Sequence, residues 1–281
     1  MPEREGFPAG VPSWIDTEQA DVDAAATFYA GVLGWQFDDR TPPGTDGRYL
    51  VATLDGRAVA GISSLGGRSH APARWNTYIA VDDADEAVTR VRDASGSVVT
   101  GPSDVGDLGR AAACADPAGA AFRLWQPGSL SGAESVNVPG AWNFSELNTS
   151  DAAGATRFYG AAFGWKVDEV DMGAISGTMV RLPGYADFLE QFDPGIRKRH
   201  ADFGAPPGFT ECVAWILPLQ PGASPHWSVS FAVADADAVA AAARDLGGSV
   251  VVEPFDIPPV RSTVIDDPAG ARFTANVFKP G

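Results

Sequence analysis

The sequence predicts an α+β fold made of four β-α-β-β-β modules, two in each half of the chain. An internal repeat is the main observation: DVDAAATFYAGVLGW at 21–35 returns as DAAGATRFYGAAFGW at 151–165. A second matching pair follows, DPAGAAFRLW at 116–125 and DPAGARFTAN at 267–276. Such a repeat indicates two domains of similar architecture. We place them at residues 1–130 and 139–281, with a Pro/Gly/Ser-rich joint between them.

In the first half, capping residues and apolar spacing predict each element in turn. Residues 14–19 are expected to form a strand, and Asp21 is a suitable N-cap for a helix that ends near Gly34. A second helix is expected after Asp83 or Asp85 and runs to Val91. The other expected strands lie at 36–38, 47–54, 57–64, 77–81, 97–100, 110–115 and 120–126.

The second half repeats this plan with one insertion. The two motif aspartates lie 95 residues apart in the first half and 116 apart in the second, so about 21 residues are added. We place the insertion near 185–207, as an extra helix, because Phe188, Leu189, Phe192 and Ile196 are spaced as one apolar helix face. The other expected elements are helices at 151–161 and 235–246 and strands at 142–149, 228–233, 249–252, 260–266 and 271–278.

Composition excludes several classes of partner. The net charge of −16 opposes binding to nucleic acid or to an anionic membrane surface. No apolar stretch approaches the roughly 20 residues needed to span a bilayer. The N-terminal sequence MPEREG lacks the order of a secretion signal, and Cys114 and Cys212 form no motif. We therefore expect a cytoplasmic protein.

The repeated motifs resemble those of the vicinal oxygen chelate superfamily, which includes glyoxalases, bleomycin resistance proteins and dioxygenases. The resemblance rests on Phe-Tyr-x-x-x-(Leu/Phe)-Gly-Trp and Asp-Pro-x-Gly. WNTYIAVDD at 75–83 and MVRLPGY at 179–185 resemble the tandem glyoxalase-like proteins of actinobacteria, some of which are labelled hydroxylases. The resemblance implies two domains with curved, cup-like mixed sheets that bind ligands inside the cup. It is a poor guide to the reaction, because one fold carries many functions.

The resemblance also implies where a metal ion would be held: seven residues before each helix-opening Asp and seven after the Asp of Asp-Pro-x-Gly. The residues at these positions are Trp14, Asn76 and Arg123 in the first half and Phe144, Ser228 and Thr274 in the second. Such sites need imidazole or carboxylate ligands, and an arginine brings a positive charge. We therefore expect no metal ion and no other cofactor. The alternative is a metal-dependent lyase or dioxygenase with shifted ligands, such as His226 with Glu146.

Strand alternation predicts which side chains share the cup with these positions. They combine aromatic rings with a few hydrogen-bonding groups, which suits a small, flat organic ligand. The neighbours expected in the cups are Asp16 and Glu18 beside Trp14, Tyr78 beside Asn76, Trp125 beside Arg123, Glu146 and Asn148 beside Phe144, Ser230 beside Ser228, and Asn276 beside Thr274.

Three residues are candidates for acid/base chemistry. Asp16 either forms a structural ion pair with Arg123 or acts as a general base. Glu146 has no matching arginine at position 274, which makes it the better acid/base candidate. His226 is either catalytic or a loop histidine.

Two further residues lie near the insertion. Arg181 either anchors an anionic or carbonyl-bearing ligand or forms a surface salt bridge. Tyr185 either lines the ligand site or packs against the insertion.

These observations predict a metal-independent protein that binds a small, aromatic organic molecule. It acts as a secondary-metabolite tailoring enzyme of the lyase, isomerase or hydroxylase type, or sequesters its ligand as resistance proteins do; the sequence leaves both open. In a further interpretation, one half is purely structural and the half with the insertion alone binds ligand. A monomer or a weak homodimer is expected.

Overall fold

A computed structural model describes residues 6–64, 73–171 and 176–279. It contains two eight-stranded mixed sheets, ordered β2-β3-β4-β1-β5-β8-β7-β6 and β10-β11-β12-β9-β13-β16-β15-β14. Each set of four strands follows the order β-α-β-β-β along the chain, which confirms the predicted α+β class and its four modules. No helix in these described ranges is long and apolar enough to cross a membrane.

The strands of the first sheet agree closely with expectation. They are β1 (Pro12–Gln19), β2 (Gln36–Asp39), β3 (Tyr49–Leu54), β4 (Arg57–Ser64), β5 (Arg74–Ala80), β6 (Ser97–Val105), β7 (Gly109–Ala115) and β8 (Ala121–Pro127).

The second sheet has three strands that the sequence did not reveal, β10, β11 and β12. Its strands are β9 (Trp142–Thr149), β10 (Lys166–Asp171), β11 (Ser176–Arg181), β12 (Cys212–Pro218), β13 (His226–Ala232), β14 (Ser249–Ile257), β15 (Val260–Asp266) and β16 (Arg272–Phe278).

The helices are α1 (Val22–Leu33), α2 (Ala84–Asp93), α3 (Ala152–Phe163), α4 (Tyr185–Phe192), α5 (Ile196–Asp202) and α6 (Ala236–Asp245), with a short 3₁₀ turn η1 at Phe209–Glu211. The capping prediction for α1 is confirmed, since the Asp21 side chain accepts from the Ala24 amide. Gly34 ends the same helix at φ 77°, a left-handed conformation that glycine adopts without steric cost.

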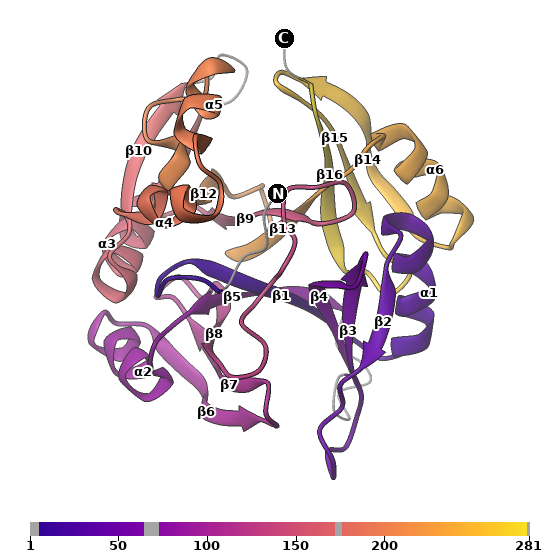
Figure 1. Ribbon diagram of the computed structural model, residues 1–281, viewed down its shortest axis with the longest axis horizontal. Helices are drawn as coiled ribbons and strands as arrows, with labels where there is room; N and C mark the ends of the chain where they lie inside the picture. Colours follow the sequence, from indigo (N-terminus) through magenta and orange to yellow (C-terminus); the bar gives the residue numbers. More distant parts are fainter. Residues whose placement is uncertain (1–5, 65–72, 172–175, 280–281) are drawn as a thin grey trace. The chain divides into compact units, whose positions relative to one another are not determined.

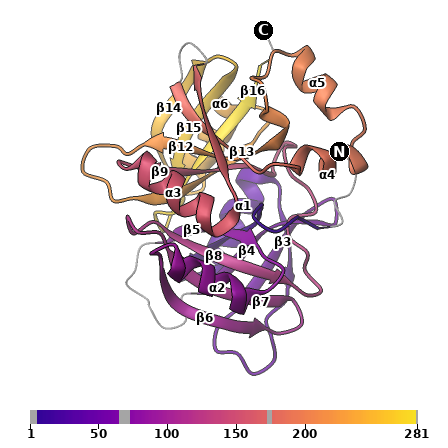
Figure 2. The ribbon, with the colours of Figure 1, turned by 90° about the vertical axis from the view of Figure 1, so that its left-hand side faces the viewer.

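The insertion forms two short helices, α4 and α5, where one helix was expected (Figure 2). The break falls at Asp193-Pro194-Gly195. Pro194 has no amide proton to continue the helix, and Gly195 takes φ 81°. The apolar residues at 188–196 keep their spacing, but Ile196 belongs to the second helix, after the turn.

The described chain divides into two compact units, and each draws on both halves of the sequence. Unit 1 contains residues 1–13, 77–132 and 144–227; unit 2 contains 14–76, 133–143 and 228–281. In unit 1, α2 lies beside α3; in unit 2, α1 lies beside α6 (Figure 1). The expected domain division at 130 to 139 follows the two sheets and stays a prediction.

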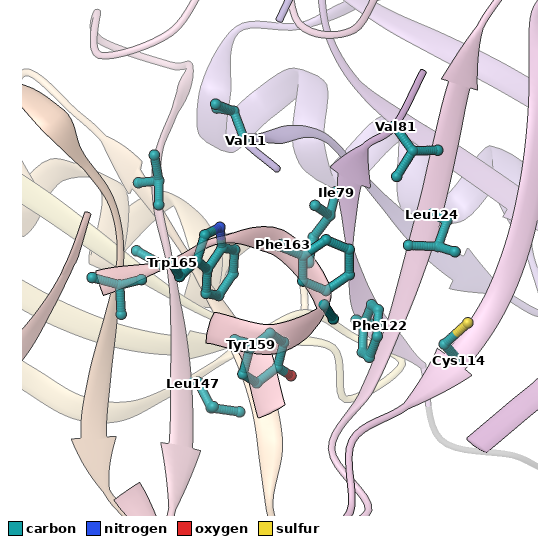
Figure 3. Packing of buried hydrophobic residues seen from close by; sticks show 14 of the residues in the cluster. Val11, Ile79, Val81, Cys114, Phe122, Leu124, Leu147, Tyr159, Phe163 and Trp165 are labelled. Atoms are coloured by element: carbon teal, nitrogen blue, oxygen red, sulfur yellow. The ribbon is translucent and has the colours of Figure 1, made fainter. Parts of the chain in front are cut away.

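The core of unit 1 is built around Tyr159 of the repeated Phe-Tyr motif (Figure 3). Its ring stacks on Trp165 at 4.8 Å, and its hydroxyl accepts from Trp227 Nε1 at 2.9 Å. The same hydroxyl lies 3.3 Å from Asp116 Oδ2 and donates to it. Burial raises the pKa of the Tyr159 phenol well above its usual range, so the proton needed for this bond is retained.

Unit 2 repeats the arrangement with Tyr29. Its ring stacks on Trp35 at 5.3 Å, and its hydroxyl donates to Asp267 Oδ2 at 2.9 Å. Gln19 Nε2 also donates to this carboxylate, at 2.7 Å. The two repeated motifs are therefore structural partners: the tyrosine of one binds the aspartate of the other.

Candidate functional site

In unit 2, the predicted cup residues of β1 lie in a closed, polar cluster. Trp14 is fully buried, and its Nε1 donates to the Tyr49 hydroxyl at 2.8 Å. Asp16 is 2% exposed and accepts from Asn76 Nδ2 at 2.7 Å. Glu18, further along the strand, is half-buried. This cluster is occupied by its own side chains.

Tyr49 is a member of this cluster that sequence reasoning missed. It lies on β3, and Gly61 of β4 makes room for it. A Cβ at Gly61 would lie 2.5 Å from the Tyr49 hydroxyl and 3.0 Å from Asp16 Cβ. A glycine inside a strand often marks such a close approach, and this was the available signal.

In unit 1, the first-half residues Tyr78, Arg123 and Trp125 lie on the neighbouring strands β5 and β8. Tyr78 and Arg123 are in register, and the guanidinium carbon lies 5.6 Å from the centroid of the tyrosine ring. Trp125 is 3% exposed, and its Nε1 donates to the Leu130 carbonyl at 2.9 Å. The two aromatic rings pack edge to face, with their centroids 6.1 Å apart. The predicted pairing of Asp16 with Arg123 stays a prediction.

The second-half residues of unit 1 present a more open surface on β9. Phe144, Glu146 and Asn148 are all half-buried, while Ser145, Leu147 and Thr149, which alternate with them, are buried. Glu146 is in register with Trp215 of β12, which is also half-buried. The Phe144 ring lies 6.3 Å from the ring of Phe209 in η1.

We call Phe144, Glu146, Asn148, Trp215 and Phe209 the β9 face. Sequence analysis missed two of them, Trp215 and Phe209. Trp215 occupies the register position that Gly61 has in the first sheet, opposite Asp16. This equivalence depends on strand pairing that the sequence alone did not give.

The remaining predicted cup residues belong to unit 2. Ser230 and Thr274 are in register on the parallel strands β13 and β16. Ser230 is buried, and Ser228, Thr274 and Asn276 are half-buried. Asn276 Oδ1 accepts from the Ser262 hydroxyl at 2.5 Å.

Arg181 forms ion pairs, one of its two predicted roles. Its Nε donates to Asp168, and its Nη1 donates to Glu211 Oε2 at 2.9 Å. These carboxylates, Asp168 above all, raise the pKa of the guanidinium. Glu211 Oε1 also accepts from the Gly184 amide at 2.8 Å, so one side chain joins the beginning and end of the insertion.

The other two candidates near the insertion are placed differently. Tyr185 is 5% exposed and its ring stacks on Phe188 at 6.1 Å, while its expected role in ligand binding stays a prediction. His226 is exposed at the start of β13, and its Nδ1 lies 2.8 Å from the Ser224 carbonyl oxygen. Its proposed catalytic role stays a prediction.

The side chains at the expected metal positions do not fit a divalent cation. The Trp14 indole nitrogen and the Asn76 amide nitrogen are already donors, and Arg123 is cationic. Among the described residues, which do not include His70, no three His, Cys, Asp or Glu side chains are grouped to hold a metal ion.

Comparison with known families gives two matches along the chain. Residues 19–124 match the Glyoxalase/Bleomycin resistance protein/Dioxygenase superfamily, and residues 145–276 match the glyoxalase-like domain.

Two relatives match across nearly the whole chain. "Putative glyoxylase CFP32" of Mycobacterium tuberculosis is 39% identical, covering 100% of this chain and 98% of that protein. "Anthracycline biosynthesis protein DnrV" of Streptomyces peucetius is 36% identical, covering 98% and 96%. Among solved structures, the Mn(II)-bound glyoxalase from Novosphingobium aromaticivorans aligns with a TM-score of 0.60 at 15% identity, covering 96% and 82%. This last likeness concerns the fold alone.

Proposed function

Because the chain belongs to the glyoxalase/bleomycin resistance protein/dioxygenase superfamily, with two tandem domains, we propose that it binds a small aromatic molecule on the β9 face without a metal ion. Members of this superfamily bind small-molecule substrates. In this proposal, the β9 face is the ligand-binding surface, and the equivalent surface of the first half has a structural role.

The observation that carries the proposal is a difference between equivalent positions of the repeat. Trp14 and Asp16 are 0% and 2% exposed and hydrogen-bonded to neighbouring side chains. Phe144 and Glu146, at the same positions in the second half, are half-exposed. A ligand can reach the second pair but not the first.

The chemistry of the β9 face supports an aromatic ligand. Phe144, Trp215 and Phe209 offer ring surfaces, which stack on flat ligands at separations of about 4.5–7 Å. Glu146 and Asn148 add polar groups that orient a ligand hydroxyl or carbonyl. The name of the relative DnrV supports a role in tailoring an aromatic natural product.

Glu146 is the acid/base group of the proposed site. Its carboxylate accepts a proton from a ligand hydroxyl or activated C–H within hydrogen-bond reach, about 3 Å. A tailoring enzyme would use this proton transfer. A sequestering protein would use the same carboxylate only as a hydrogen-bond acceptor.

Fluorescence titration with 2-naphthol tests the proposal. The wild type should bind it, and Phe144→Ala and Trp215→Ala should each weaken binding about tenfold, or about 1.4 kcal/mol. Phe278→Ala is the matched control, since Phe278 is 50% exposed on β16 in unit 2. No binding by the wild type, or an equal loss in the control, contradicts the proposal. Asp16→Asn and Glu146→Gln then separate the halves: only the second should alter binding.

A further inference from the structure

The insertion forms a partly open hollow of about 290 Å³ beside α5. Its wall is formed by α5 and by residues 205–211, with Ala186 of α4. Small apolar side chains, among them Ala201 and Pro206, alternate with the polar groups of His200 and Thr210. The first half has no equivalent insertion, so this hollow is specific to the half that carries the proposed site.

Phe209 connects the hollow to the β9 face. It belongs to the wall of the hollow, and its ring lies 6.3 Å from Phe144. On its other side, the ring lies 5.1 Å from the imidazole of His200. A row of three rings therefore leads from β9 into the insertion.

The loop at 205–211, which forms one wall of the hollow, is held in place by contacts at its end. Glu211 binds Gly184 and Arg181, as described above. Gly208 has φ 80°, and a Cβ there would lie 2.8 Å from Arg181 Cδ. The loop therefore fits closely over the arginine. A wall fixed in this way costs little further ordering when a ligand binds.

His200 offers a hydrogen-bonding group to the hollow. Its Nδ1 lies 2.9 Å from the Thr210 hydroxyl, and its Nε2 has no hydrogen-bond partner among the described residues. Burial lowers the pKa of the imidazole, with Arg199 adding to the effect, so the ring is neutral near pH 7. A neutral imidazole has one donor and one acceptor, and Nε2 can pair with a hydroxyl or a carbonyl.

We propose that this hollow is a subsite for the far ring of an extended aromatic ligand whose near ring stacks on the β9 face. The inference rests on the proposed function and further specifies how long the ligand is. A cavity of about 150 Å³ is enough to hold benzene, so the hollow has room for one substituted ring. The preferred ligand has three or more rings, fused or linked, and carries a hydroxyl or carbonyl at the end that meets His200.

Two probes of different length test the subsite: 2-naphthol, which is short, and 2,6-dihydroxyanthraquinone, which is long and has a hydroxyl at its far end. Ala201→Trp fills the hollow from an exposed helix position. It should weaken binding of the long probe at least about tenfold and leave 2-naphthol within about twofold. Lys198→Trp is the matched control on the same helix, since Lys198 does not line the hollow and its side chain is 79% exposed; it should change neither.

A second variant tests the polar contact. His200→Asn keeps a side-chain amide that can form a hydrogen bond with Thr210 but has no atom at the place of Nε2. It should weaken binding of the long probe about three- to tenfold and leave binding of 2-naphthol unchanged. The subsite is refuted if the wild type binds both probes equally, if Ala201→Trp weakens both alike, or if it weakens neither. If 2-naphthol fails to bind the wild type, the proposed function itself is refuted, and the subsite with it.

Discussion

At the scale of single residues, the repeated motifs are explained by hydrogen bonding in the core. Asp116 Oδ1 accepts from the amides of Ala118 and Ala120, which shapes its own turn, and Oδ2 accepts from Tyr159. Asp267 makes the same bonds with Ala269, Ala271 and Tyr29. In each unit, a buried hydrogen bond from a tyrosine to a carboxylate therefore joins the two repeated motifs.

Tyr159→Phe should destabilise the protein although it removes only one oxygen atom. Trp227 Nε1 loses its acceptor and Asp116 loses a donor, and an unpaired buried polar group costs about 1–3 kcal/mol. The free energy of unfolding, measured by urea titration, should fall by about that amount. Thr156→Ala, on the same helix, is the control because its hydroxyl donates to the Ala152 carbonyl near the surface. Equal effects of the two substitutions would argue against a structural role for the tyrosine.

At the scale of elements, hydrogen bonds join the two ends of the insertion. Glu211, at the end of the insertion, binds both the Gly184 amide before α4 and Arg181 at the end of β11. The helices of the insertion carry buried Leu189 and Ile196, which join the core of unit 1. The insertion therefore has two attachments, an apolar one through its helices and a polar one at its base.

Glu211→Ala should loosen the insertion locally. Removing the carboxylate leaves the Gly184 amide and one side of the Arg181 guanidinium without their partner. Hydrogen exchange should accelerate across residues 184–211 and change little in α1 and α6 of unit 2. Glu253→Ala is the control, because this exposed glutamate pairs with Arg244 at the surface of unit 2. Faster exchange throughout the chain would indicate global destabilisation and would contradict a local role of Glu211 in holding the insertion.

At the scale of the whole molecule, the content of bound metal separates the proposed function from its metal-dependent alternative. The protein purified without chelator should contain far less than one equivalent of Fe, Mn, Ni or Zn by elemental analysis. Its affinity for 2-naphthol should be unchanged after dialysis against EDTA, since none of the six expected ligand positions holds a suitable donor. A near-stoichiometric metal, or loss of binding that added metal restores, would favour a metal-dependent lyase or dioxygenase.

Sequence reasoning recovered what local signals encode. Asp21 and Gly34 mark the ends of α1 through capping and positive φ, which depend on neighbouring residues only. It missed β10, β11 and β12, and the partners Tyr49, Trp215 and Phe209 of the candidate site. Those contacts depend on the register of strands far apart in the chain, which no short pattern contains. The pairing of α1 with α6 and of α2 with α3 is equally non-local.

Unit 2 is built from segments that lie far apart in the sequence, and this affects how the protein folds during synthesis. Its aromatic cluster joins Tyr29, Trp35 and Trp75 to Phe231 and Phe273, which are synthesised much later than the first three. Some 150 residues separate the two parts, and at about 5–20 residues per second the ribosome needs on the order of 10 to 30 s to add them. During that interval the early aromatic side chains lack their native cover. Nascent chains of this protein should therefore depend on chaperones longest in their first module.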